Sequence, residues 1–230
     1  MMKLRTKGQG LIEYAIILAL IAVSTGLTLE ATGTSLKSVF CDVVMGLGAS
    51  AGGCGGSLLQ DDFTGDALSD WEIVKGKWHP EDGKLCGGPG EGQIYTDIGA
   101  SDYVINLTGA MLEKGDGFGI FFRADNYKKV DGYSFQFDPG YGSGEFIMRE
   151  WAHGNEFSPF ARQKPSSSFD WHEVPHDVRL EIKGDTFSAY IDDELVVQGS
   201  DSTYAEGGIG LRTWDGTKVC FDGISVDPIQ

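Results

Sequence analysis

The sequence contains one long apolar run, from residue 11 to residue 29, in which Glu13 is the only charged side chain. A helix rises about 1.5 Å per residue, so a run of this length spans roughly the 30 Å hydrocarbon core of a bilayer. Apolar residues then recur every three or four positions as far as Leu47, which favours an amphipathic continuation. We predict that residues 9–46 form one hydrophobic α-helix that is inserted in the inner membrane.

Glycine occupies half of the positions from 46 to 57, in the stretch GLGASAGGCGGS. Glycine loses more backbone entropy on ordering than any other residue, so this composition disfavours both helix and strand. We therefore predict a flexible linker at 47–59 and a second domain at 60–230.

From residue 58 onward the sequence consists of short segments rich in β-branched and aromatic residues, such as GFGIFFRA, GYSFQFD, EFIMREW and GGIGLRTW. Gly, Asp, Asn and Pro separate them, which is typical of antiparallel strands joined by turns. Within VRLEIKGDTFSAYIDDELVVQG the turns KGD and DDE predict a three-stranded meander. The predicted fold class is α+β by segregation, with a long N-terminal helix followed by an all-β antiparallel sandwich.

Acidic residues outnumber basic ones by 34 to 18, which gives a formal net charge of −16. Such a chain repels phosphate groups, so nucleic acid is excluded as a partner. An acidic surface suits cations or neutral ligands.

The four cysteines are Cys41, Cys54, Cys86 and Cys220, and none forms a CxxC pair, which argues against a zinc site. In an exported chain an even number of cysteines favours disulfides. Three connectivities are open. We expect Cys41 to pair with Cys54 across a local loop, and Cys86 with Cys220 if an early strand and the final strand are neighbours.

The N-terminus, KGQGLIEYAIILALIAV, places a short basic leader and Gly8 directly before the apolar run, with Glu13 and Tyr14 following in register. This arrangement resembles the type IV prepilin signal and is most similar to the short pilins of the Tad (Flp) branch, over about the first 40 residues. The resemblance implies that residues 1–8 are a leader, that prepilin peptidase cuts after Gly8, and that Gln9 becomes the mature N-terminus. Gln9, Glu13 and Tyr14 would then act in filament assembly.

The chemistry of Glu13 is consistent with that role. A lone carboxylate in hydrocarbon costs a few kcal/mol and requires a partner. The free α-amine of Gln9 in a neighbouring subunit can supply one, and the buried pair would fix the register of packed helices. The alternative is a simple membrane anchor in which Glu13 reaches the interface.

The remainder of the chain carries a second set of motifs: an opening DDF, then W, GKWHPEDGKL, and a closing GGIGLRTWDGTKVCFDGISV. These resemble concanavalin-like jelly-roll domains, in particular the laminin-G-like and 3-keto-disaccharide-hydrolase-like group, over residues 60–229. The resemblance implies a jelly-roll fold and says little about activity.

Catalysis is not expected. Retaining jelly-roll glycosidases carry two carboxylates about 5 Å apart on one strand, and the alternating E.D..E pattern of such enzymes is missing from this sequence. In the hydrolase-like group a glutamate commonly stands where this chain has Ser134. We predict that the protein is not an enzyme.

A binding surface is the remaining possibility, because sugars are held by aromatic faces and by side chains that form paired hydrogen bonds. Alternation along the central strands places several polar residues on one concave face, and three tryptophans lie near strand ends. The candidates for carbohydrate binding are Arg123, Ser134, Gln136, Arg149, Trp151, Trp171 and Trp214, whereas Trp71 and Trp78 are expected in the core.

A structural calcium ion is the one cofactor that the sequence suggests. Asp61, Asp62 and Asp222 are oxygen ligands of the kind that Ca²⁺ prefers. Aspartate is also the ordinary residue of turns, so the alternative is that all three only shape the chain.

Together these features predict a subunit of an extracellular Tad-like pilus on the cell surface. It would polymerise with copies of itself through the pilus assembly machinery and display a jelly-roll domain for adhesion or glycan binding. The alternatives are an anchored or pilus-displayed glycan-processing enzyme and a minor pseudopilin of a secretion system.

Overall fold

The computed structural model describes residues 57–65, 68–125, 127–140, 144–214 and 216–229. The predicted leader and helix, with Gly8, Gln9, Glu13 and Tyr14, lie outside these residues, as does the predicted Cys41–Cys54 disulfide. Ser57–Gln230 is a compact unit. Within the described ranges, no helix is long and apolar enough to cross a membrane.

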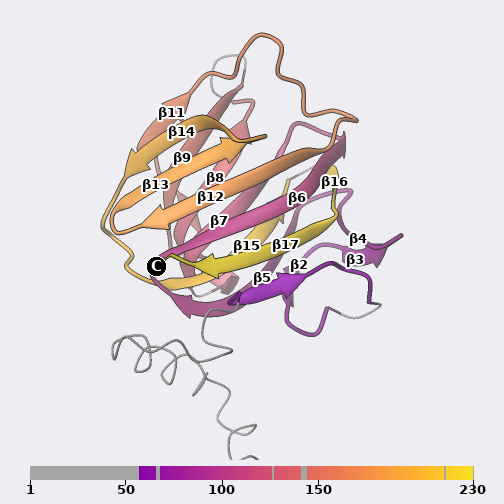
Figure 1. Ribbon diagram of the computed structural model, residues 1–230, viewed down its shortest axis with the longest axis horizontal. Coiled ribbons are helices and arrows are strands. Elements are labelled where there is room, and N and C mark those ends of the chain that lie inside the picture. The colour runs from indigo at the N-terminus through magenta and orange to yellow at the C-terminus, as the bar shows by residue number, and fades with distance from the viewer. Residues whose placement is uncertain (1–56, 66–67, 126, 141–143, 215, 230) are drawn as a thin grey trace, which may run out of the picture. The chain divides into compact units, whose positions relative to one another are not determined.

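Two antiparallel sheets lie one over the other (Figure 1). The strands of the first are β1 (Leu59–Asp61), β3 (Trp78–Glu81), β4 (Lys84–Gly87), β6 (Tyr103–Lys114), β12 (His176–Lys183), β13 (Thr186–Ile191), β14 (Glu194–Ser200), β16 (Lys218–Phe221) and β17 (Gly223–Pro228). Their order is β14–β13–β12–β6–β16–β4–β3, with β17 also paired to β6 and β1 to β17.

The second sheet carries Gln136, Arg149 and Arg212. Its strands are β2 (Glu72–Lys75), β5 (Gly92–Ala100), β7 (Phe118–Asp125), β8 (Asp131–Asp138), β9 (Glu145–Ala152), β10 (Asn155–Glu156), β11 (Ala161–Gln163) and β15 (Gly207–Thr213). Their order is β10–β9–β8–β7–β15–β5–β2, with β11 also on β9. A short 3₁₀ helix, η1 (Tyr127–Lys129), links β7 to β8. The predicted all-β antiparallel sandwich is confirmed.

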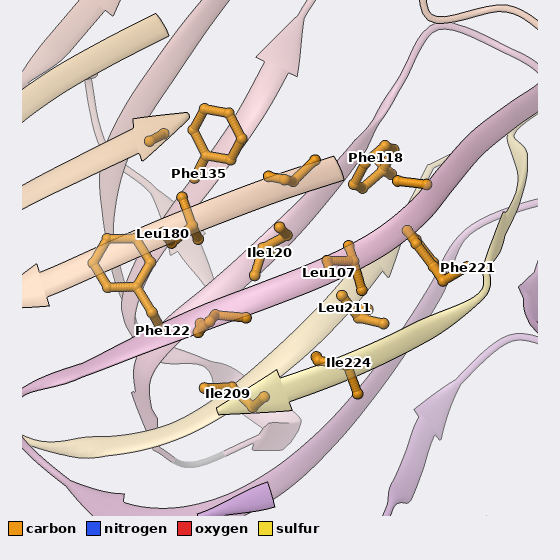
Figure 2. Packing of buried hydrophobic residues seen from close by; sticks show 14 of the residues in the cluster. Leu107, Phe118, Ile120, Phe122, Phe135, Leu180, Ile209, Leu211, Phe221 and Ile224 are labelled. Carbon is orange, nitrogen blue, oxygen red and sulfur yellow. The ribbon is translucent and has the colours of Figure 1, made fainter. Parts of the chain in front are cut away.

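The core lies between the sheets and is built by period-two alternation. Along β7, Phe118, Ile120 and Phe122 face the interior, where they meet residues such as Leu107 and Phe221 from the other sheet (Figure 2). Trp71 and Trp78 are also buried in this cluster, as expected. The outer face of the second sheet is therefore left to the alternate residues of the same strands.

The predicted meander is confirmed as β12–β13–β14. Gly184 in the first turn and Asp192 and Asp193 in the second have positive φ, which tight hairpin turns require.

The linker was predicted to continue to residue 59, but Leu59 already pairs with Val226.

The predicted Cys86–Cys220 disulfide is confirmed. The two residues are direct partners in the register of β4 and β16, which are adjacent strands. The disulfide therefore joins the early and late parts of the domain within one sheet.

Candidate functional site

A cluster of polar side chains lies on the outer face of the second sheet. Ser134 and Gln136 on β8 alternate with the core residue Phe135, and Arg149 on β9 alternates with the core residue Met148. Arg212 on β15 follows the core residue Leu211 in the same way. Three strands therefore present polar groups to one surface, as the alternation of a β-strand dictates.

Two glycines make room for long side chains to lie flat on this surface. A Cβ atom on Gly119 would lie 2.8 Å from Cγ of Arg212, and one on Gly210 would lie 2.4 Å from the ring of Tyr95. Real Cβ contacts are not this short, so each position requires glycine for the arrangement observed.

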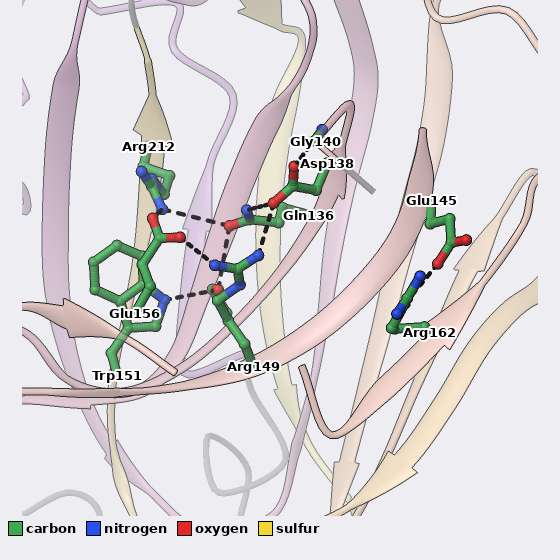
Figure 3. A network of polar contacts seen from close by, with 10 residues as sticks. Gln136, Asp138, Gly140, Glu145, Arg149, Trp151, Glu156, Arg162 and Arg212 are labelled. Atoms are coloured by element: carbon green, nitrogen blue, oxygen red, sulfur yellow. Dashed lines mark hydrogen bonds and ion pairs between the residues drawn. The ribbon is translucent and has the colours of Figure 1, made fainter. Parts of the chain in front are cut away.

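Glu156 bridges two arginines at the centre of the cluster (Figure 3). One of its oxygens accepts a hydrogen bond from Nη1 of Arg149, and the other lies 2.8 Å from Nη1 of Arg212. Arg149 also donates to Asp138 at 2.7 Å, and Nε2 of Gln136 donates to the same carboxylate at 3.2 Å. The result is a charge-balanced network of two guanidinium groups, two carboxylates and one amide.

Trp151 forms part of the floor beneath this network. Its indole Nε1 donates to Oγ of Ser134 at 2.9 Å, and its ring packs edge-on against Phe121 at 5.2 Å. The guanidinium of Arg212 lies 4.6 Å from the ring centroid, in cation–π geometry. Because Trp151 is only 5% exposed, its face is covered by Arg212 rather than open for stacking, which corrects the expectation of a free platform.

Trp214 also lies near Arg212, with the guanidinium 5.5 Å from the centroid of its ring. It is partly exposed, so it retains the surface position predicted for it. The predicted residues Gln136, Arg149, Trp151 and Trp214 are thus brought together around Arg212.

A groove of about 630 Å³ opens beside the network. Its charged lining residues are Glu72, Lys75, Glu91, Lys128, Glu156 and Arg212, three of each sign. Lys75 and Glu91 form an ion pair of 2.5 Å on its wall. The groove is therefore close to neutral, in a chain whose formal net charge is −16.

Two stacked tyrosines belong to the apolar cluster that contains Trp151, and Tyr95 is fully buried there. Tyr95 and Tyr127 lie parallel, with ring centroids 4.5 Å apart. Burial raises the pKa of Tyr127 to about 12, with Asp97 and Asp125 adding to the effect, and burial also raises the pKa of Tyr95. Both phenols are therefore neutral groups in ordinary conditions.

Arg123 does not belong to this site, which corrects the prediction. The register of β7 against β8 shifts between Phe122 and Asp125, and Arg123 itself has φ of 44°. This irregularity breaks the alternation and turns the side chain toward the loops. Its guanidinium donates to the backbone carbonyls of Ser101, Tyr204 and Gly184, at 2.7 to 3.1 Å.

Trp171 is also misplaced by the prediction, since it lies in the core cluster with Phe118, Phe146 and Phe169. It lies on a loop, as expected, but the loop folds its ring inward.

The three carboxylates considered for calcium do not form a ligand group. Asp61 accepts from the backbone of Phe63 and from the indole of Trp71, while Asp62 accepts from Thr64. Asp222 pairs with Lys84. Across the described ranges, no three His, Cys, Asp or Glu residues are grouped so that they could hold a metal ion, and the aspartates act in turns and ion pairs instead.

Sequence reasoning did not select Asp138, Glu156 or Arg212. Alternation in GGIGLRTW would have identified Arg212, because it shares a face with the glycines two and four positions earlier. Glu156 lies on a strand of only two residues. No local pattern indicates that its side chain reaches across three neighbouring strands.

The fold and this surface define the class: an antiparallel jelly-roll sandwich with a polar network and a groove on the outer face of one sheet. The chain belongs to the family of 3-keto-alpha-glucoside-1,2-lyase-like domains, whose match covers residues 59–227.

Two proteins of Bacillus subtilis are similar to it. The levanase of strain 168 is 30% identical over 156 residues, which is 66% of this chain and 22% of the levanase. The solved carbohydrate-binding module CBM66 is 27% identical with a TM-score of 0.57, over 68% of this chain and 95% of the module. The chain thus spans 22% of its curated relative and nearly all of the solved module.

A third similarity concerns the fold alone. The carbohydrate recognition domain of Emp46p, in its potassium-bound form, is 14% identical with a TM-score of 0.56. The match covers 76% of this chain and 98% of that domain.

Proposed function

We propose that the domain is a non-catalytic module that binds an uncharged glycan in the groove beside Arg212 and Glu156. The observation that carries this proposal is the charge-balanced network of Figure 3. Sugar hydroxyls both donate and accept hydrogen bonds. A guanidinium can donate to two adjacent oxygens, and a carboxylate can accept from two adjacent hydroxyls.

The charges support a neutral ligand over an acidic one. Arg149 and Arg212 are already neutralised by Asp138 and Glu156. An anionic sugar would have to displace these carboxylates inside a chain of formal net charge −16, at a cost in repulsion. The similarity to a solved carbohydrate-binding module supports the same class of ligand.

Aromatic surface is also present for the C–H faces of a sugar ring. Trp214 is partly exposed beside Arg212 and can supply such a surface.

The ligand class is tested by titrating residues 57–230 with neutral polysaccharides, levan among them, and with uronate polymers of matched length. Calorimetry should show binding of at least one neutral polymer, and the uronates should bind more weakly. Arg212→Met should weaken the interaction, whereas Arg179→Met, on β12 of the other sheet, should not. Tighter binding of the uronates, or no binding of any neutral polymer on a broad glycan array, would contradict the proposal.

A glycan-processing activity is the second candidate function, because the description of the family names a lyase. One observation argues against such an activity. Asp138 and Glu156 both form ion pairs with Arg149, whereas retaining glycosidases use two carboxyl groups that are free to react with the sugar. Incubation with glucosides and fructans, followed by NMR of the sugars, distinguishes the two. Any turnover that Glu156→Gln abolishes would establish an enzyme.

We also propose that the chain displays this domain on a surface filament. The support is the prepilin-like sequence around Gly8 and Glu13. Glu13→Ala should leave the protein in the membrane while stopping filament growth, whereas Glu30→Ala, outside the motif, should not. Electron microscopy of sheared filaments and mass spectrometry of a subunit beginning at Gln9 test this. A membrane-anchored protein without filaments, or a trace subunit, would favour the anchor or the minor pseudopilin.

A further inference from the structure

The loop between β11 and β12, residues 164–175, closes one end of the sandwich core. Phe169 packs against Phe146 with ring centroids 5.1 Å apart, and Trp171 packs against Phe118 at 5.2 Å. The loop passes from one sheet to the other, so whatever fastens it also holds the two sheets together at this end.

His172 fastens the loop to the turn between β6 and β7. Its Nδ1 lies 3.1 Å from a carboxylate oxygen of Asp170, and its Nε2 lies 2.8 Å from the backbone carbonyl of Gly115. The backbone N–H of Glu173 also donates to the carbonyl of Leu112, on β6.

His176 fastens the same loop to the turn between β13 and β14. Its Nδ1 lies 2.6 Å from a carboxylate oxygen of Asp192, and its Nε2 lies 2.8 Å from the backbone carbonyl of Asp170. Its side chain is 10% exposed, and its ring packs against Phe169 and Trp171.

The chemistry of these contacts requires protons on both nitrogens of each ring. A backbone carbonyl and an ionised carboxylate accept hydrogen bonds and cannot donate them. A neutral imidazole has only one N–H, so it satisfies one of its two contacts and directs a lone pair at the other oxygen. We propose that His172 and His176 form an acid-strengthened clasp, which fastens the 164–175 loop to the β6–β7 and β13–β14 turns when the two rings are protonated.

The surrounding charges favour protonation of His172. The groups that face the two rings are Asp116 from the β6–β7 turn, Asp170 from the loop itself and Asp192 from the β13–β14 turn. The pKa of His172 is raised above its ordinary value, first by the Gly115 carbonyl and then by Asp170, while burial opposes the rise. Hydrogen bonds from His172 lower the pKa of Asp170, so this carboxylate remains charged in mild acid.

The sign of the pH effect follows from linkage. A pKa that is raised in the closed state stabilises that state fully below the ordinary histidine value, and the stabilisation is lost as the pH rises through the raised value. Each unit of difference between the pKa values of the closed and open states corresponds to about a tenfold change in the equilibrium constant for opening.

The clasp also controls a second groove. This groove, of about 330 Å³, lies between the loop at Pro165 and Phe169 and the edge strand β14 at Leu195. Asp192 lines it as well, so His176 connects its two walls. Opening the clasp changes the shape of this groove without touching the network around Arg212.

The experiment is amide hydrogen exchange of the full chain at pH 5.5 and pH 8, corrected for the intrinsic rates. Peptides covering 164–175 should be protected about fivefold or more at the lower pH relative to the higher. NMR titration of the histidine rings in the same protein should show both His172 and His176 doubly protonated at pH 5.5.

His172→Gln and His176→Gln should each reduce this pH dependence, and the double variant should abolish it. His153→Gln, whose ring is 83% exposed, is the matched control and should retain it. If His176→Gln fails to fold, His172→Gln and the titration of the unaltered chain still decide the question. Equal protection at both pH values, or neutral rings at pH 5.5, would overturn the proposal.

Discussion

Two regions of the domain hide arginine side chains to a similar degree, and they do so in different ways. Arg123 is 2% exposed and donates mainly to backbone carbonyls at one end of the sandwich. Arg149 and Arg212, on the outer face of the second sheet, are 5% and 8% exposed and pair with the side chains of Asp138 and Glu156.

The difference lies in what the partners can do. Backbone carbonyls are fixed by the fold. The hydrogen bonds of Arg123 therefore hold three loops together, and these acceptors cannot turn away from Arg123 to let a ligand replace them. The carboxylates that hold Arg149 and Arg212 are on side chains that rotate, and the groove lies beside them. Burial of an arginine therefore does not distinguish a structural role from a binding role, whereas the identity of its partners does.

The strongest test of this comparison is the same substitution in both regions. Arg123→Met should lower the free energy of unfolding by about 3 kcal/mol or more, because several partly buried carbonyls lose charged donors. Urea denaturation measures this. A loss below about 1 kcal/mol, the range of an ordinary surface change, would show that Arg123 is not structural.

Arg212→Met should have a small effect on stability and a large effect on glycan binding. Glu156 keeps Arg149 as a partner, so stability should change by only about 1 kcal/mol. Affinity for the neutral glycan should fall about tenfold to a hundredfold, as for a central binding residue. Calorimetry on both methionine variants decides the comparison, and unchanged affinity for Arg212→Met would remove Arg212 from the site.

Gly119→Ala sharpens the comparison without changing any charge. The new Cβ would lie 2.8 Å from Cγ of Arg212 and force that side chain to move, so we expect about a tenfold loss of affinity. Gly65→Ala, where a Cβ would meet nothing within 4 Å, is the control. Equal effects of the two changes would show that the position of Arg212 is not critical.

Ser134→Ala should have a smaller effect. It removes the acceptor of the indole N–H of Trp151, and an unpaired buried donor costs about 1 kcal/mol or slightly more. The indole N–H resonance of Trp151 should shift, whereas Ser202→Ala, at an exposed position, should leave it in place. An unshifted resonance would mean that this hydrogen bond is absent in solution.

The smallest expected effect is a change in the acid sensitivity of unfolding, caused by Asp201 at the end of the sandwich where Arg123 lies. Burial would raise the pKa of Asp201, but hydrogen bonds from Tyr133 and Thr203 outweigh it and lower the value. A lowered pKa stabilises the fold above the ordinary aspartate value, and the contribution is lost as the pH falls through the lowered one.

Tyr133 also accepts from the backbone of Tyr204, whose carbonyl binds Arg123. Asp201→Asn should therefore reduce the acid sensitivity of unfolding below about pH 4. The exposed Asp185→Asn should not, and identical pH profiles for the two variants would contradict the assignment.

Much of the fold was predictable because it depends on local patterns. The opening motif of the resembled fold placed Trp71 and Trp78 in the core, the turns defined the β12–β14 meander, and the Cys86–Cys220 pair followed from expecting the strands to be neighbours. The site was predictable in part. Gln136 and Arg149 were identified because regular strands preserve the face of each residue, and Trp151 because it lies near a strand end in polar surroundings.

The errors arose where regularity breaks. The irregularity in β7 turned Arg123 away from the face on which strict alternation places it. The 164–175 loop carried Trp171 into the core, although nothing in its local sequence requires this.

The sequence by itself determined the antiparallel sandwich, the β12–β14 meander and the facing of residues on regular strands, because alternation and turn chemistry act over a few neighbouring residues. Only the tertiary structure decided that Glu156 bridges Arg149 and Arg212, and that His172 and His176 each meet two acceptors. These contacts join strands and loops distant in the chain. Their geometry depends on sheet order and loop paths, which no local pattern specifies.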